Sequence, residues 1–223
     1  MTFDIAGLDV GKSQDYSAIV IGNVDPPNNI LRIKAAKRWA RKTDYKNVER
    51  DVEQIYKKTN LHFIGIEING PGAVLHDHLK ARGVRVKPVT TMGKITDIQK
   101  QRDFTKMSKP QYAKWILMAK QQNVIRFPAK STKYLDELIE QIPLFKEHIT
   151  EAGQAQYYAE GRSHDDLVMA MMVMCRFASK WIKLNGDGGI RAGPAYPSLS
   201  QSQNQDPIEL HDESMRAMGL VEI

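Results

Sequence analysis

Three separated segments of this chain carry carboxylates beside apolar runs, where a shared metal site would need them. Asp9 lies at the end of the first apolar run, Glu67 interrupts a later one, and Asp165 and Asp166 precede a long apolar segment. A carboxylate at the end of a buried strand is costly unless something compensates its charge, and a divalent cation is the usual compensation. The three segments together therefore predict one acidic site for hard cations.

Each of these positions also has a purely structural interpretation. An isolated Asp before a turn, such as Asp9, commonly just ends a strand. Its neighbours Leu8 and Val10 place it within the strand instead, and there it needs a cation or several hydrogen-bond donors. Glu67 has no basic partner nearby in the sequence, and Asn69-Gly70 supplies a tight turn directly after it.

The Asp165–Asp166 pair has the strongest structural alternative. Ser163 with Asp166 three residues later resembles a capping box, and acidic residues favour a helix N-terminus. The segment that follows, Leu-Val-Met-Ala-Met-Met-Val-Met-Cys, is apolar on every side of a helix and is expected to be buried. Its first turn would then bring both carboxylates and His164 inward.

The elements that must position these residues follow from hydrophobic periodicity and turn signals. Strands are predicted over residues 3–10, 16–24, 30–39, 61–68, 84–89 and 124–127. Helices are predicted over 45–58, 70–82, 109–122, 131–141 (with Ser131 as its cap) and 163–184, and a hairpin over 144–159. Three early strands followed by strands alternating with helices predict an α/β fold with a mixed sheet.

Composition indicates one domain and a tail. Residues 1–184 can bury a single core, whereas the segment 185–223 is rich in Gly, Pro, Ser and Gln and is expected to be flexible. After residue 185 there are six acidic and two basic residues, a net charge of −4 against +10 for the rest. A basic body favours a polyanionic partner such as nucleic acid.

Composition also excludes several classes of protein. The single cysteine, Cys175, rules out a disulfide framework and a thiolate zinc cluster. The longest apolar run is too short to cross a bilayer, and no secretion signal opens the chain, so a cytoplasmic protein without membrane contact is expected.

Two further motifs concern phosphate binding. Gly11-Lys12-Ser13 is not a phosphate loop, because Gly7 lies one residue too close to it. Basic residues follow the fifth predicted strand and could track a phosphate backbone: Lys94, Lys100, Arg102 and Lys106.

The ordered combination of Gly-Leu-Asp-Val-Gly, Asp-Tyr-Ser-Ala, Glu-Ile-Asn-Gly-Pro-Gly and His-Asp-Asp-Leu-Val-Met-Ala resembles the nuclease domain of the large terminase subunit of tailed bacteriophages. The resemblance covers roughly residues 3–183. It implies an RNase H-like fold, related to RuvC-type resolvases, and cleavage of concatemeric viral DNA during packaging. Because family members carry an N-terminal ATPase with a phosphate loop, the chain looks like the excised or separately encoded nuclease half.

Carried over by position, the resemblance implies that Asp9, Glu67 and Asp166 are catalytic metal ligands. Asp165 is a further candidate ligand, and it is accessory together with Asp15 and His164. Two Mg²⁺ or Mn²⁺ ions about 4 Å apart would clamp the scissile phosphate. The implied partners are double-stranded DNA, the terminase ATPase domain, the portal and the small terminase subunit, in the infected cell and transiently at the procapsid.

Three alternatives remain open from the sequence. A Holliday-junction resolvase or RNase H would use the same fold on branched DNA or an RNA–DNA hybrid. An actin-like sugar kinase or ATPase shares the first acidic hairpin, but this chain is too short for the second lobe. A catalytically silent DNA-binding or assembly module would bind DNA without cutting it.

Overall fold

The fold is described from a computed structural model of the chain. The structure describes residues 1–11, 15–91, 105–130, 132–149, 155–159 and 165–185; the side chains of 145–149 and 155–159 are not described. The proposed acidic tail lies outside these residues, apart from Asn185. Among the helices described, none has the length and apolar character needed to cross a bilayer.

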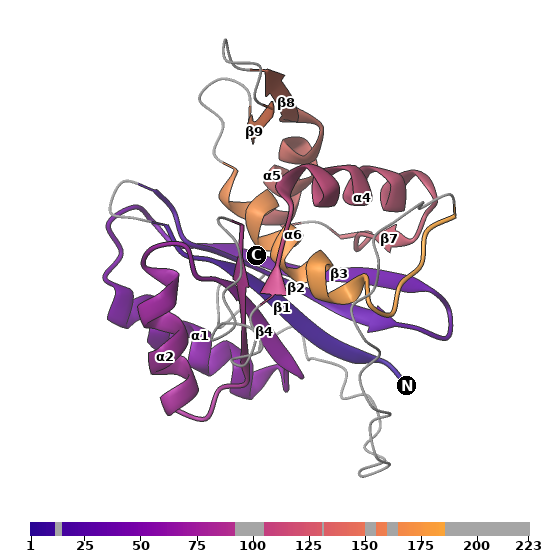
Figure 1. Ribbon diagram of the computed structural model, residues 1–223. Coiled ribbons are helices and arrows are strands. Elements are labelled where there is room, and N and C mark those ends of the chain that lie inside the picture. Colours follow the sequence, from indigo (N-terminus) through magenta and orange to yellow (C-terminus); the bar gives the residue numbers. More distant parts are fainter. Residues whose placement is uncertain (12–14, 92–104, 131, 150–154, 160–164, 186–223) are drawn as a thin grey trace.

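A seven-stranded mixed sheet forms the centre of the molecule (Figure 1). Its strand order is β6-β5-β4-β1-β2-β3-β7, in which β1, β2 and β3 are antiparallel, whereas β4, β5 and β6 continue parallel to β1. The strands are β1 (Phe3–Asp9), β2 (Ala18–Asp25), β3 (Ile30–Arg38), β4 (Phe63–Glu67), β5 (Val86–Thr90), β6 (Thr105–Lys106) and β7 (Ile125–Arg126). This is the mixed sheet that the sequence predicts: the predicted strand 124–127 is confirmed as the edge strand β7, and the two-residue strand β6 at the other edge was not predicted.

Helices cover both faces of the sheet (Figure 1). On one face lie α1 (Tyr45–Lys58) and α2 (Gly72–Ala81); on the other lies α6 (Asp166–Ala178), itself covered by α4 (Lys109–Gln121), α5 (Lys133–Gln141) and the short 3-10 helix η1 (Ile142–Leu144). Strands β8 (Phe145–Ile149) and β9 (Ala155–Ala159) form a separate antiparallel pair, which confirms the predicted hairpin.

Alternation along the strands decides which side chains meet α6. Because successive strand side chains point to opposite faces, Ile5 packs in the core with α6, and Leu8 packs in the core with α1 and α2. The same rule assigns Asp9, which follows Leu8, to the α6 face. Along β4, Phe63 lies in the α6 core and Ile66 in the other, so Glu67 also belongs to the α6 face.

The predicted boundaries at two helices need correction. Helix α6 runs over Asp166–Ala178 rather than 163–184, and its cap position is Asp165. The chain leaves the helix axis after Ala178, where Trp181 packs edge-on against Phe3 at a centroid distance of 4.9 Å. Helix α5 begins at Lys133 with Thr132 at the cap position, so the predicted cap at residue 131 is wrong.

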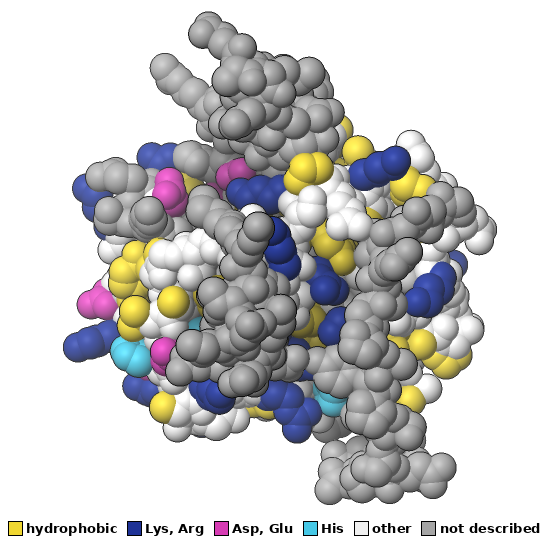
Figure 2. Space-filling view, viewed as in Figure 1, with side chains coloured by type: hydrophobic (Ala, Val, Ile, Leu, Met, Phe, Trp, Pro, Cys, Tyr) yellow, Lys and Arg dark blue, Asp and Glu magenta, His cyan; other side chains and the backbone are white. Residues whose placement is uncertain are grey.

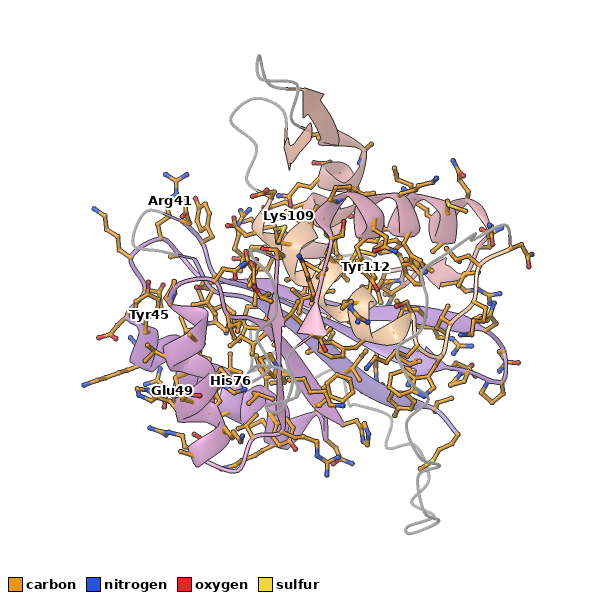
Figure 3. All side chains as sticks on the ribbon, viewed as in Figure 1. Arg41, Tyr45, Glu49, His76, Lys109 and Tyr112 are labelled. Carbon is orange, nitrogen blue, oxygen red and sulfur yellow. The ribbon has the colours of Figure 1, made fainter. Side chains whose placement is uncertain are left out.

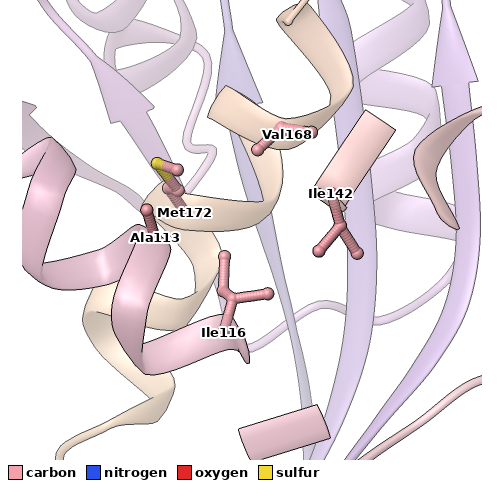
Figure 4. A pocket seen from close by; sticks show the side chains of 5 residues that line it. All are labelled: Ala113, Ile116, Ile142, Val168 and Met172. Atoms are coloured by element: carbon pink, nitrogen blue, oxygen red, sulfur yellow. The ribbon is translucent and has the colours of Figure 1, made fainter. Parts of the chain in front are cut away.

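Helix α6 is buried on nearly all sides, as its sequence predicts, because every residue except Arg176 is buried. Toward α4 and η1 a small apolar cavity of about 10 Å³ remains, lined by Ala113, Ile116, Ile142, Val168 and Met172 (Figure 4). A space of this size and apolar lining is too small and too dry to hold a ligand. The layers around α6 are therefore closely packed.

Glycine in β1 allows α6 to lie directly on the strand backbone. A Cβ atom at Gly7 would come within 2.0 Å of the Ala170 carbonyl oxygen and 2.5 Å of the Met174 nitrogen. Both atoms belong to the backbone and cannot move aside independently of the helix. Gly7 thus sets how closely the start of α6 approaches the ends of β1 and β4.

We expect Gly7→Ala to lower the free energy of unfolding by about 3 kcal/mol or more, because overpacking against backbone forces α6 away from the sheet. Gly83→Ala is the matched control, since Gly83 has open space around its Cβ position but a φ of +79°. It should cost only the roughly 1–2 kcal/mol of left-handed strain. Urea unfolding of both variants measures this, and an equal or smaller loss for Gly7→Ala would contradict the packing argument.

Candidate active site

The first two carboxylates of the site come from neighbouring parallel strands. Asp9 ends β1 and Glu67 ends β4, and the register pairs Leu8 with Ile66 immediately before them. The two side chains are close enough for the charge of Glu67 to raise the pKa of Asp9. Two carboxylates that act on each other in this way are costly without a bound cation.

The third carboxylate comes from the start of α6. Asp166 is the first residue of the helix and is only 6% exposed. Its Oδ2 atom is buried without a hydrogen-bond partner among the described residues. Asp165 at the cap position makes no side-chain capping bond, so capping does not account for this acidic pair. A buried oxygen without a donor is costly, and a bound cation would compensate it.

Burial and mutual repulsion shift the pKa values of these acids. Burial raises the pKa of Asp9 well above its ordinary value, and the charges of Glu67, Asp166 and Asp165 raise it further. For Asp166, burial followed by the charge of Asp165 raises the pKa to about 6, with a smaller contribution from Asp15. The carboxylates predicted from three segments, with Asp15 beside them, therefore form one electrostatic group.

Two side chains that the sequence interpretation missed hold Glu67 in place. Thr91 Oγ1 donates to Glu67 Oε1 at 2.6 Å, and Asn69 Nδ2 donates to the same oxygen at 2.9 Å. Thr90 Oγ1 in turn donates to Asn69 Oδ1 at 2.9 Å. Asn69 was interpreted only as a turn residue, and the signal for the others is the Thr-Thr pair that closes the strand after β4.

Arg38 at the end of β3 is a further residue that the sequence interpretation missed. Its positive charge lowers the pKa of Asp166 and so opposes the shift caused by burial. An ion pair with Glu137 at 2.7 Å holds the guanidinium, which also lies over the Tyr16 ring at 4.5 Å. No local motif marks Arg38, because its relation to Asp166 arises only when β3 and α6 pack together.

The oxygen atoms that these carboxylates offer are suited to hard divalent cations. Among the described residues, no three acidic, histidine or cysteine side chains already surround a single point as ligands would. The carboxylates raise the pKa values of one another without forming such a set of ligands, and Asp166 Oδ2 is buried without a hydrogen-bond partner among the described residues. An all-oxygen set that repels itself in this way suits Mg²⁺ or Mn²⁺ better than zinc.

Of the predicted basic and histidine residues, the structure describes only Lys106. His164, Lys94, Lys100 and Arg102 lie outside the described residues. Lys106 is exposed on β6, where it pairs with Thr90, the donor to Asn69. Lys106 therefore lies at the carboxyl end of the sheet, two strands from Glu67. Figure 2 shows Lys and Arg side chains spread over the side of the molecule that faces the viewer in Figure 1.

Comparisons with solved structures place the fold. The model is similar to the large terminase nuclease of thermophilic phage G20c with bound magnesium (TM-score 0.57, 17% identity, 77% of this chain and 79% of that one). It is also similar to the nuclease domain of the large terminase subunit gp2 of bacterial virus Sf6 (TM-score 0.57, 12% identity, 78% and 87%). The P22 large terminase nuclease domain gives a TM-score of 0.54 at 12% identity, with 79% and 81% covered.

These likenesses confirm the predicted RNase H-like fold of terminase nuclease domains. At identities this low they establish the fold and leave the activity to be argued from the site. No protein-family model matches the sequence, and no curated protein matches it either.

We expect Asp166→Asn to change how stability depends on pH in the presence of chelator. The folded state holds the Asp166 proton more tightly than the unfolded chain does, so wild-type stability is lost as pH rises from 3.8 to about 6. A shift of this size corresponds to roughly 3 kcal/mol. Between pH 4 and pH 7, the free energy of unfolding of Asp166→Asn relative to that of the wild type should therefore increase by about that amount.

Urea unfolding across this range measures the difference. Asp136→Asn, on the exposed side of α5, removes the same charge without burial and is the control. A curve for Asp166→Asn that runs parallel to that of the wild type would show that this carboxylate is not held in a costly charged state.

Proposed function

We propose that this protein is a metal-dependent endonuclease that cuts double-stranded DNA in the manner of phage terminase large subunits. The observation that carries the proposal is the convergence of Asp9, Glu67 and Asp166 on the α6 face at the carboxyl end of the sheet. Structures of terminase nuclease domains with the same fold hold magnesium or manganese, which supports divalent cations for this chain.

In this proposal Asp9 is the shared ligand, because β1 lies between β2 and β4 and the charges of both Glu67 and Asp166 raise the pKa of Asp9. Glu67 and Asp166 would hold the cations from either side, with Asp165 and Asp15 accessory. When bound, two such cations supply an activated water for attack on the scissile phosphate and offset charge on the leaving 3′-oxygen. Thr91 and Asn69 keep Glu67 pointed at the site, and Arg38 limits the charge around Asp166.

The biological setting belongs to the proposal as well. Residues 1–184 would form the nuclease domain, and residues 185–223 a flexible acidic tail. The substrate would be concatemeric viral DNA in the cytoplasm of an infected bacterium, held with little sequence preference by Lys106 and the basic segment before it. A packaging ATPase, the portal and a small terminase subunit would be its partners at the procapsid.

We expect Asp9→Asn and Glu67→Gln to abolish DNA cleavage while leaving the fold intact. Either change removes a ligand that contributes several kcal/mol to the transition state, a loss of roughly 100-fold or more in rate. Nicking of supercoiled plasmid with Mg²⁺, Mn²⁺ or chelator measures the activity, with Asp136→Asn as the control. Wild-type activity in either variant would rule out this site.

The same assay separates related nucleases. A linear duplex, a four-way junction and an RNA–DNA hybrid should be compared at equal concentration. Preference for the duplex supports a terminase nuclease, whereas preference for the junction or the hybrid would replace it with a resolvase or RNase H. Metal-dependent nicking would be absent from a silent DNA-binding module.

A second test measures metal binding independently of DNA cleavage. We expect Mg²⁺ or Mn²⁺ to raise the Tm of the wild-type protein, since cations relieve the repulsion between Asp9 and its neighbours. At a hundredfold excess over Kd, the stabilisation is about 2.7 kcal/mol. Asp9→Asn should lose most of this rise, and a potassium salt of equal ionic strength provides the control. An equal rise in Asp9→Asn would place the bound cation elsewhere.

A further inference from the structure

A pocket of about 410 Å³ lies beside the carboxylate site and is not used by the mechanism above. Its described lining residues come from two parts of the chain, one between β1 and β2 and the other the loop that leads into α1. Its lining residues are Gly11, Asp15, Ser17, Ala40, Lys42, Thr43, Asp44 and Tyr45. This volume lies in the range of pockets that bind small ligands.

The pocket is tied to the carboxylates by backbone and hydrogen bonds. Gly11 follows Asp9 by two residues, which is about 7 Å of extended chain. The Gly11 amide donates to Ser17 Oγ at 3.2 Å, and Tyr45 Oη donates to the Gly11 carbonyl oxygen at 3.1 Å. The start of α1 is thereby fixed to the end of the strand that carries Asp9.

Lys42 is the cation among the described residues that line this pocket. It occupies a left-handed turn with φ of 64°, and Thr43 closes the turn by donating through its hydroxyl to the Ala40 carbonyl oxygen at 2.6 Å. The side chain is exposed, and the next basic residue, Arg41, lies over the Tyr16 ring at 4.8 Å. Figure 3 shows Tyr45 at the start of α1 and Arg41 in the loop before it.

The two acids of the pocket have other roles. Asp44 caps α1, because its side chain accepts from the Lys46 amide at 2.9 Å. Asp15 belongs electrostatically to the carboxylate group, since it acts on Asp166. The cations of the proposed function would offset that charge. Among the described lining residues, an anionic ligand is left with one exposed ammonium group, Lys42, and the edge of the Tyr45 ring, which is 42% exposed.

We propose that this pocket binds a DNA backbone phosphate next to the scissile one, with Lys42 as its contact and Tyr45 as a positioning residue. The inference rests on the proposed function. Lys side chains are usual phosphate contacts, and such contacts set register without reading sequence. The Tyr45 hydroxyl donates to Gly11 and therefore positions the start of α1 beside the phosphate. A second phosphate held at a fixed distance from Asp9 places the scissile bond among the carboxylates.

The test is binding of a short fluorescent duplex in chelator, measured by anisotropy over a range of salt concentrations. We expect Lys42→Gln to bind about tenfold more weakly at 0.1 M salt, with the slope of log K against log salt reduced by about 0.9, since one phosphate contact is lost. Lys42→Arg should restore both values. Lys58→Gln removes the same charge at the far end of α1, about 20 Å away, and should match wild type.

The outcomes separate this inference from the proposed function. Equal affinity and equal slope for Lys42→Gln and Lys58→Gln would overturn the phosphate site, while wild-type cleavage would leave the nuclease proposal standing. Weaker binding without a change in slope would show that the pocket holds a base instead, and would also overturn it. A wild-type protein that neither binds nor cuts DNA would refute the proposed function and this inference with it.

Discussion

The direct contact between helix α6 and the bare backbone of β1 at Gly7 determines where the acidic residues can meet. A helix buried on nearly all sides has one favourable position, in which its apolar surface is covered by the sheet on one side and by α4 and α5 on the other. Because α6 cannot slide without opening voids, its first residue, Asp166, stays at the carboxyl end of β1 and β4. Close packing in the core therefore places a carboxylate at the site.

This placement has a cost that the rest of the site limits but does not remove. Thr91 and Asn69 donate hydrogen bonds to Glu67, and the charge of Arg38 lowers the pKa of Asp166. One oxygen of Asp166 still lacks a donor among the described residues. Repulsion of this kind is typical of functional sites that bind a cation, because the bound cation offsets the negative charge and stabilises the fold. Without the cation, the clustered carboxylates lower the stability of the protein.

The pocket next to the carboxylates extends the same arrangement to the substrate. Its walls come from the turn after β1 and from the start of α1, which the Tyr45–Gly11 hydrogen bond joins. A ligand held there is positioned relative to Asp9 by backbone, and backbone is stiffer than a long side chain. The end of β1 would in this way position both the catalytic carboxylate Asp9 and the substrate.

Much of the fold followed from the sequence alone, because hydrophobic period and turn chemistry act locally. The antiparallel start of the sheet, the parallel strands after it, the buried final helix and the three acidic segments were all predicted from such patterns. Alternation along β1 and β4 even assigns Asp9 and Glu67 to one face. Only tertiary packing decided the rest: the β3–β7 pairing, the true start of α6, the bonds from Thr91 and Asn69 to Glu67, and the approach of Arg38 to Asp166. These depend on distances between segments far apart in the chain, which no local pattern of residues encodes.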